Sequence, residues 1–163
     1  MTESAVLPCR AVMASPLGPI TLVEEAGRLT RLSWGKDAPD TRSDRSALLD
    51  RARLQLDAYF RGRRDRFDLP LAPRGTAFQQ RVWQMMRRIP YGETWSYAEL
   101  ARRTGNVARA VGQACGANPI PIIIPCHRVL AENGHLGGFS AVGGSDSKSW
   151  LLELEGARPL RLL

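Results

Sequence analysis

The chain has 163 residues, of which 44% are hydrophobic and 24% charged, and a formal net charge of +7. No stretch approaches the roughly 20 uninterrupted apolar residues of a membrane span, and the N-terminus lacks the basic-then-apolar pattern of a secretory signal. The three cysteines, Cys9, Cys115 and Cys126, are too few for a disulfide framework, and no Cys-x-x-Cys pair indicates zinc. These features predict a single reduced, cytoplasmic, metal-free protein of one domain or two small ones.

The positive charge comes almost entirely from arginine: 21 of the 23 basic residues are Arg, and only Lys36 and Lys148 are Lys. The planar guanidinium group binds phosphate oxygens in pairs, so a nucleic acid is a candidate partner. A charge that merely keeps the protein in solution explains the same numbers.

The first third of the chain predicts a small antiparallel sheet followed by a helix. Short apolar segments at 10–14, 20–23 and 29–34 are separated by turn residues, as in a β-meander. Apolar residues then recur at helical spacing over 44–61. Two prolines and a glycine at 69–75 indicate a linker. We therefore expect two domains, residues 1–70 and 71–163.

The second half begins with helical patterns. Thr76 and Gln79 predict a capping box, followed by an apolar stripe that we expect to be buried. That stripe consists of Phe78, Val82, Trp83, Met86 and Ile89. Ser96 predicts the N-cap of a short helix over 97–103, and a turn at 104–106 leads to a second helix over 107–117. Two short helices joined by a glycine-containing turn are typical of a helix-turn-helix, although many helix pairs in protein cores have the same pattern.

Residues 118–128 carry three prolines around an isoleucine run and end in Cys126, His127 and Arg128. Proline cannot donate to a sheet, so we expect a rigid, buried, extended segment rather than a central strand. Cys126 is either a small core residue or a reactive thiol whose pKa is lowered by the cationic neighbours. Since adjacent side chains of an extended chain point to opposite sides, His127 can act on Cys126 only through a turn or a bridging water. Acidic partners for the imidazole are Glu132, Asp146, Glu153 and Glu155.

The segment Pro125-Cys126-His127-Arg128 resembles the active-site motif of the O6-alkylguanine-DNA alkyltransferases, also called methylated-DNA–protein-cysteine methyltransferases. Further blocks resemble the same family in the same order, and together they cover about residues 75–157. These blocks are 76–83, 89–94, 96–97, 108–112, 118–119 and 150–156. Residues 1–70 resemble the variable N-terminal domain of that family only loosely.

The resemblance implies an α+β fold, with a ribonuclease-H-like sheet and helix at the N-terminus and a mostly helical C-terminal domain containing a helix-turn-helix. It implies a suicide enzyme that flips O6-alkylguanine out of the duplex and keeps the alkyl group, without a cofactor. The implied catalytic residues are Cys126 as nucleophile, His127 as its base through a water, Glu155 as the partner of His127, Asn118 as a brace and Tyr97 as proton donor to the guanine.

The same resemblance assigns DNA contacts and a base pocket. Arg109 would fill the gap that the flipped base leaves, and Tyr97, Ala108, Ala110 and Gly112 would line the DNA surface. The pocket would be lined by Val129, Phe139, Ser140 and Lys148, with Lys148 at its edge. The implied partner is double-stranded DNA containing O6-alkylguanine, bound by a monomer that could also cluster on DNA.

Three other functions fit parts of the pattern. A protein that binds alkylguanine without transferring the group would lack the cysteine. A helix-turn-helix regulator would have only a structural cysteine, and a cysteine hydrolase would turn over soluble esters or peptides.

Overall fold

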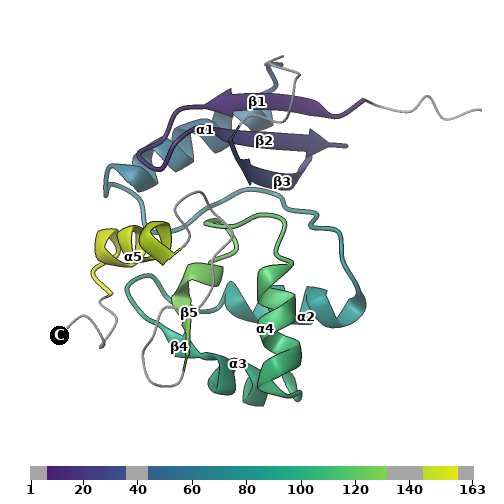
Figure 1. Ribbon diagram of the computed structural model, residues 1–163. Helices are drawn as coiled ribbons and strands as arrows, with labels where there is room; N and C mark the ends of the chain where they lie inside the picture. Colours follow the sequence, from purple (N-terminus) through teal and green to yellow (C-terminus); the bar gives the residue numbers. More distant parts are fainter. Residues whose placement is uncertain (1–6, 36–43, 132–144, 158–163) are drawn as a thin grey trace, which may run out of the picture. The chain divides into compact units, whose positions relative to one another are not determined.

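A computed structural model of the chain describes residues 7–35, 44–131 and 145–157. The chain divides into two compact units, Met1–Pro73 and Arg74–Leu163 (Figure 1). The described elements comprise small sheets and helices, which confirms the predicted α+β class. No helix in the described ranges is both long and apolar enough to cross a membrane.

The N-terminal unit contains a three-stranded antiparallel sheet in the order β1 (Cys9–Met13), β2 (Ile20–Glu25), β3 (Arg28–Trp34). Its register pairs Ala11 with Leu22 and Leu22 with Leu32, and all three side chains are buried. The predicted linker joins this unit, because Pro70 accepts from the backbone N–H of Leu29 at 2.9 Å. The β-meander prediction is therefore confirmed, and Leu71 forms an additional parallel bridge with Leu29 of β3.

Helix α1 (Ala47–Phe60) belongs to the same unit and contacts β1 and β2. Ser46 caps it by accepting from the backbone N–H of Leu49 at 2.9 Å, so the helix begins a few residues later than the apolar spacing predicted. One face is buried, as the spacing required; its members are Leu48, Leu49, Ala52, Leu56, Tyr59 and Phe60.

The C-terminal unit is mostly helical. It contains α2 (Ala77–Met86), α3 (Tyr97–Thr104), α4 (Ala108–Gly116) and α5 (Ser145–Leu154). The Thr76–Gln79 capping box is present, which confirms that prediction. The buried indole of Trp83 donates to the carbonyl of Ala114 at 2.8 Å and so joins α2 to α4.

The prediction that Phe78 is buried was wrong. Phe78 lies in the first turn of α2 and remains partly exposed, with the guanidinium of Arg81 5.7 Å from its ring centre. A second feature was not predicted: β4 (Trp95–Ser96) and β5 (Val129–Leu130) form a short parallel pair. This pair places the start of α3 beside the end of the cysteine-bearing segment.

Candidate active site

The segment that leads to Cys126 is turned rather than extended, which corrects the sequence prediction. The backbone N–H of Ile124 bonds to the carbonyl of Ile120 at 2.9 Å, and Ile122 has a φ of +73°. A β-branched residue at positive φ is strained, so its surroundings must hold it there. Because the prolines around the isoleucines cannot donate to a sheet, the isoleucines do not form a regular strand. They lie in a buried turn instead.

Asn118 holds this turn through both ends of its side-chain amide. Its Nδ2 donates to the carbonyl of Ile124 at 2.8 Å, and its Oδ1 accepts from the backbone N–H of Ile120 at 3.0 Å. The side chain is buried, so these bonds are not exchanged with solvent. Asn118 therefore fixes the backbone directly before Cys126.

Cys126, His127 and Arg128 form a single 3₁₀ turn, η1 (Cys126–Arg128). With about three residues per turn, successive side chains leave the axis roughly 120° apart rather than on opposite sides. All three side chains are buried. The backbone turn that the sequence argument required for a Cys126–His127 relationship is present.

His127 bonds to a carboxylate at the end of α5. Its Nε2 lies 2.8 Å from Oε2 of Glu155, and both side chains are fully enclosed. Of the acidic candidates from the sequence, Glu155 is therefore the one that contacts the imidazole. Glu153 is exposed and makes no hydrogen bond to it among the described residues. The side chain of Asp146 is not described, and Glu132 lies outside the described residues.

The charges of this pair follow from burial and hydrogen bonding. Burial alone would raise the pKa of Glu155, but hydrogen bonds from His127 and Arg128 outweigh it and hold the pKa at about 2. Burial lowers the pKa of His127, against the opposing effect of Glu155, so the imidazole is neutral at pH 7. An ionised carboxylate can only accept, so the Nε2 proton is assigned to the bond with Glu155.

That assignment leaves the lone pair of His127 on Nδ1. Nδ1 is buried and has no hydrogen-bond partner among the described residues. Buried polar atoms in proteins normally bond to protein or to water. The imidazole is therefore oriented so that its basic nitrogen is available to accept a proton.

The thiol of Cys126 does not have the lowered pKa that its neighbours in the sequence suggested. Burial raises its pKa, while a hydrogen bond from Asn118 and the positive charge of Lys148 act in the opposite direction. Arg128 points to Glu155 rather than to the sulfur. Adjacency in a 3₁₀ turn does not bring the guanidinium to the thiol, so Arg128 does not lower the pKa of Cys126 as expected.

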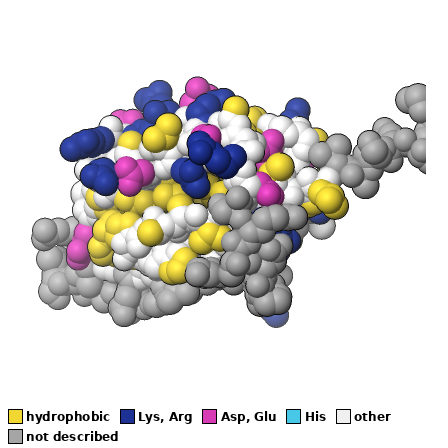
Figure 2. Space-filling model, turned by 90° about the horizontal axis from the view of Figure 1, so that it is seen from above, with side chains coloured by type: hydrophobic (Ala, Val, Ile, Leu, Met, Phe, Trp, Pro, Cys, Tyr) yellow, Lys and Arg dark blue, Asp and Glu magenta, His cyan; other side chains and the backbone are white. Residues whose placement is uncertain are grey.

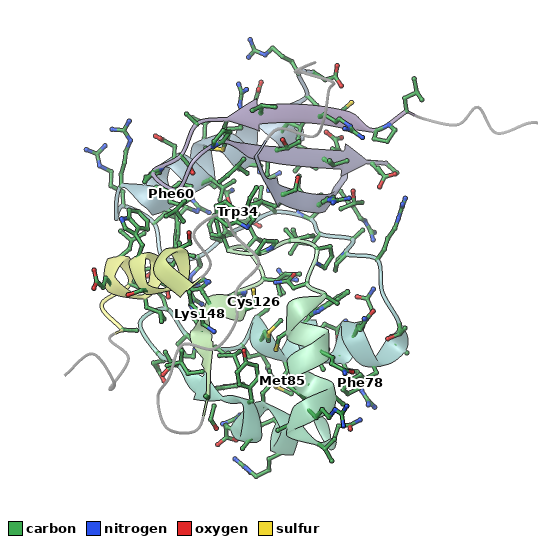
Figure 3. All side chains as sticks on the ribbon, viewed as in Figure 1. Trp34, Phe60, Phe78, Met85, Cys126 and Lys148 are labelled. Atoms are coloured by element: carbon green, nitrogen blue, oxygen red, sulfur yellow. The ribbon has the colours of Figure 1, made fainter. Side chains whose placement is uncertain are left out.

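Lys148 lies close enough to Cys126 for its charge to act on the thiol, and its expected place at the edge of a base pocket stays a prediction. Its side chain is fully buried on α5, and Nζ donates to the carbonyl of Val129 at 2.7 Å. In Figure 3 Lys148 and Cys126 lie next to each other. Burial lowers the pKa of Lys148 to about 8, against the opposing effect of Cys126 and Cys115 in their thiolate forms, so the ammonium is still mostly charged at pH 7.

Tyr97 lies at the start of α3, half-buried, with its ring 5.9 Å from Nζ of Lys148. Burial raises its pKa to about 12, and Cys115 and Cys126 in their thiolate forms act in the same direction, so its hydroxyl stays protonated at pH 7 and can donate. Ser96 caps α3 by accepting from the backbone N–H of Glu99 at 2.9 Å, as predicted. This cap fixes the position from which Tyr97 projects.

Helix α4 presents small residues and one arginine. Ala108 and Arg109 are exposed, while Ala110 and Gly112 are partly exposed. A Cβ at Gly112 would lie 4.0 Å from the Tyr97 ring, so α4 passes close to that ring. Within the described part of the chain, no ion pair is found for Arg109.

Charge on the remaining surface is mixed where it can be seen. On the face drawn in Figure 2, Lys and Arg side chains lie among Asp and Glu side chains and hydrophobic patches. Between residues 77 and 117, by contrast, six arginines face two glutamates. The helices around Arg109 are therefore a locally basic part of the chain.

Some predicted site residues are not tested. Phe139 and Ser140 lie outside the described residues, so their expected place in a base pocket stays a prediction. Val129 is buried at the start of β5.

In the described ranges no group of three or more His, Cys, Asp or Glu side chains could hold a metal ion. Cys115 is buried with its sulfur 3.5 Å from that of Met86.

One residue of the site was missed by sequence reasoning. The sequence predicts Arg128 as a cation beside the thiol, whereas in the structure it binds the carboxylate that holds His127. A buried carboxylate that pairs with a neutral histidine needs further donors to stay ionised, and this need could have pointed to Arg128.

Comparison with known proteins gives matches along nearly the whole chain. The model "6-O-methylguanine DNA methyltransferase, DNA binding domain" matches residues 77–157, and "6-O-methylguanine DNA methyltransferase, ribonuclease-like domain" matches residues 9–73. A methylated-DNA–protein-cysteine methyltransferase of Methanosarcina acetivorans is 45% identical over 90% of this chain and 97% of its own length. The Bacillus subtilis constitutive enzyme of that name is 42% identical over 86% of this chain and 91% of its own.

A solved structure gives the same result. The crystal structure of Mycobacterium tuberculosis OGT in complex with DNA has a TM-score of 0.81 and 44% sequence identity, and covers 94% of this chain and 96% of that chain. The fold implied by the sequence resemblance is thus confirmed. The chain belongs to the 6-O-methylguanine DNA methyltransferase family.

Proposed function

We propose that this protein repairs alkylated DNA by transferring the alkyl group from O6 of guanine to the sulfur of its own Cys126. The observation that carries the proposal is the buried arrangement of Cys126 and a neutral His127 whose Nε2 bonds to Glu155 at 2.8 Å. A nucleophile, a base and a group that orients the base are the parts that thiol chemistry needs.

The first step is access to the base. The O6 atom lies within the duplex stack, so the nucleotide must be flipped, at a cost of a few kcal/mol for unstacking. Helices α3 and α4, joined by a short turn at Gly105, would bind DNA as a helix-turn-helix. The small residues of α4 would allow the backbone to approach closely, and Arg109 would occupy the vacated stack.

The second step is thiolate formation. The raised pKa of Cys126 means that the free thiol is protonated at pH 7 and needs a base. His127 would accept that proton at Nδ1 through a water, and Glu155 would stabilise the imidazolium that results. The ammonium of Lys148 would stabilise the thiolate, since its charge lowers the pKa of Cys126.

The third step is displacement at the alkyl carbon. The sulfur–carbon bond forms as the carbon–O6 bond breaks, and the electron pair of that bond stays on the guanine. The protonated Tyr97 hydroxyl would donate to N3 of the guanine and neutralise the leaving group. The thioether product is not hydrolysed under mild conditions, so each molecule would react once.

Residues 139 and 140 would complete the base pocket with Val129 and Lys148. We expect a cytoplasmic monomer that needs no cofactor and reads damage rather than sequence. The presence of Cys126 disfavours a protein that only binds alkylguanine, and the buried His127–Glu155 pair disfavours a purely structural cysteine.

Mass spectrometry tests the proposal directly. Duplex DNA carrying O6-methylguanine is mixed with the wild type, with Cys126→Ser and, as a matched control, with Cys115→Ser. We expect a single methyl group on the peptide containing Cys126 in the wild type and in the Cys115→Ser control, and none in Cys126→Ser. Methylation of Cys115, or repeated turnover with unmodified protein, would overturn the proposal.

A further inference from the structure

Arg128 is an arginine enclosed in the protein, with 7% of its surface exposed. Its Nε donates to Oε1 of Glu155 at 2.7 Å and its Nη2 to Oε2 at 2.9 Å. A fork of this kind fixes a carboxylate in both position and plane. Oε2 is the same atom that accepts from His127, so Arg128 and His127 share one acceptor.

A turn after α2 holds Arg128 in place. The third donor, Nη1, bonds to the carbonyl of Ile89 at 2.8 Å, and the guanidinium lies 5.7 Å from the centre of the Tyr91 ring. The Tyr91 hydroxyl donates to the carbonyl of Leu154 at 3.3 Å, next to Glu155 in the chain. The turn therefore contacts both the guanidinium and the backbone that carries the carboxylate.

Gly92 shows how close this contact is. Its φ is +84°, and a Cβ there would lie 3.2 Å from the backbone oxygen of Glu155. Only glycine combines that conformation with that approach at low cost. The 89–92 turn and the end of α5 are thus fitted to each other around Arg128.

We propose that Arg128 is a positioning residue of the transfer reaction: it fixes the Glu155 carboxylate for His127, and the 89–92 turn fixes Arg128. This inference rests on the proposed function. Arg128 bonds to Glu155 rather than to the thiol of Cys126, so it acts on the reaction through Glu155.

The charges around His127 give the role a measurable signature. The charged groups that act on it are Lys148 from α5, Glu155 directly after α5, and Arg128 from η1. Glu155 raises the pKa of His127, whereas Arg128 and Lys148 lower it. Removing the positive charge of Arg128 therefore raises the pKa of His127, so that the imidazole becomes protonated, and useless as a base, at a higher pH.

The experiment compares the wild type with Arg128→Gln, Arg128→Lys and the control Arg87→Gln, which removes an exposed arginine at the end of α2. The rate of alkyl transfer from a duplex oligonucleotide carrying O6-methylguanine, at saturating concentration, is measured in a single turnover between about pH 5 and pH 9. The ¹⁵N signals of the His127 ring are followed over the same range, which does not depend on transfer.

For Arg128→Gln we expect at least a roughly tenfold slower transfer at neutral pH and an acid limb shifted up by about one pH unit. Arg128→Lys keeps the charge but lacks the fork, so its acid limb should stay near that of the wild type while its rate remains reduced. Arg87→Gln should match the wild type in both measurements.

An Arg128→Gln protein with the wild-type rate and the wild-type His127 titration would overturn the inference. A uniformly lower active fraction with an unchanged pH profile would also overturn it, because that indicates a merely structural role. If Arg128→Gln does not fold, a wild-type rate in Arg128→Lys is the refuting result. A wild type that transfers nothing refutes the proposed function, whereas the His127 titration still decides on Arg128.

Discussion

Asn118→Ala tests whether the turn before Cys126 depends on one side-chain amide. The substitution removes a bond to the carbonyl of Ile124 and one from the N–H of Ile120, at 2.8 and 3.0 Å. Both backbone groups lie in a buried segment, and an unsatisfied buried group costs about 1–3 kcal/mol. Because relaxation of the strained Ile122 would offset part of this cost, we expect the free energy of unfolding to fall by about 3 kcal/mol.

Thermal unfolding and single-turnover transfer are the two assays. For a chain of this size the loss corresponds to a Tm lower by about 6–12 °C. The transfer rate should fall as well, because the variant lacks the hydrogen bond that lowers the pKa of Cys126. The matched control is Asn106→Ala, whose exposed amide accepts from the next backbone N–H and has no other hydrogen-bond partner in the described ranges.

We expect the control to lie within about 0.5 kcal/mol of the wild type. An Asn118→Ala protein as stable as that control would refute the account of the turn. Full stability together with an unchanged transfer rate would leave Asn118 no role at the site.

The remaining predictions concern charge and packing. Glu155→Gln leaves Arg128 buried without its counter-charge, so we expect a loss of about 3 kcal/mol at pH 7. Because the folded pKa of Glu155 is about 2, against a usual value of about 4.3, the wild type loses this stabilisation as the pH falls from about 5 to 2. The gap between the two proteins in acid unfolding should therefore narrow, and a constant gap would contradict the assignment. For Lys148→Met the pH dependence should lie in the alkaline range. The pKa of Lys148 is about 8 in the folded protein and 10.5 in the unfolded chain, so the stability of the wild type relative to the variant should rise between about pH 8 and 10.5. A flat difference would show that the lysine is not desolvated. Trp83→Phe removes the bond to Ala114 and part of the buried ring, and calorimetry should show a loss of about 2 kcal/mol, whereas an unchanged Tm would exclude this link between α2 and α4.

The parts of the fold that sequence predicts well are those governed by local rules. The capping box at Thr76 and the N-cap at Ser96 are specified by neighbouring residues and were found as predicted. The apolar period of α1 likewise determines which face is buried. Phe78 differed because it lies in the first turn of α2, where periodicity does not tell whether a partner covers the ring.

The site was less predictable because its contacts join distant segments. The bond between His127 and Glu155 spans 28 residues, and that between Arg128 and the carbonyl of Ile89 spans 39. Four carboxylates were open to His127 from the sequence alone. Proline spacing excluded a regular strand before Cys126, but it did not reveal that Asn118 would stabilise a strained turn in place of an extended chain.

The central claim is that His127 is a neutral base whose Nε2 proton is held by an ionised Glu155. ¹⁵N NMR of the histidine rings measures this directly, because protonated and unprotonated ring nitrogens have separate shifts. At pH 7 the account predicts that His127 is neutral, with the proton on Nε2 and the lone pair on Nδ1, and that it becomes charged only below the usual histidine pKa of about 6.5. An imidazolium at pH 7, or a proton on Nδ1, would contradict it.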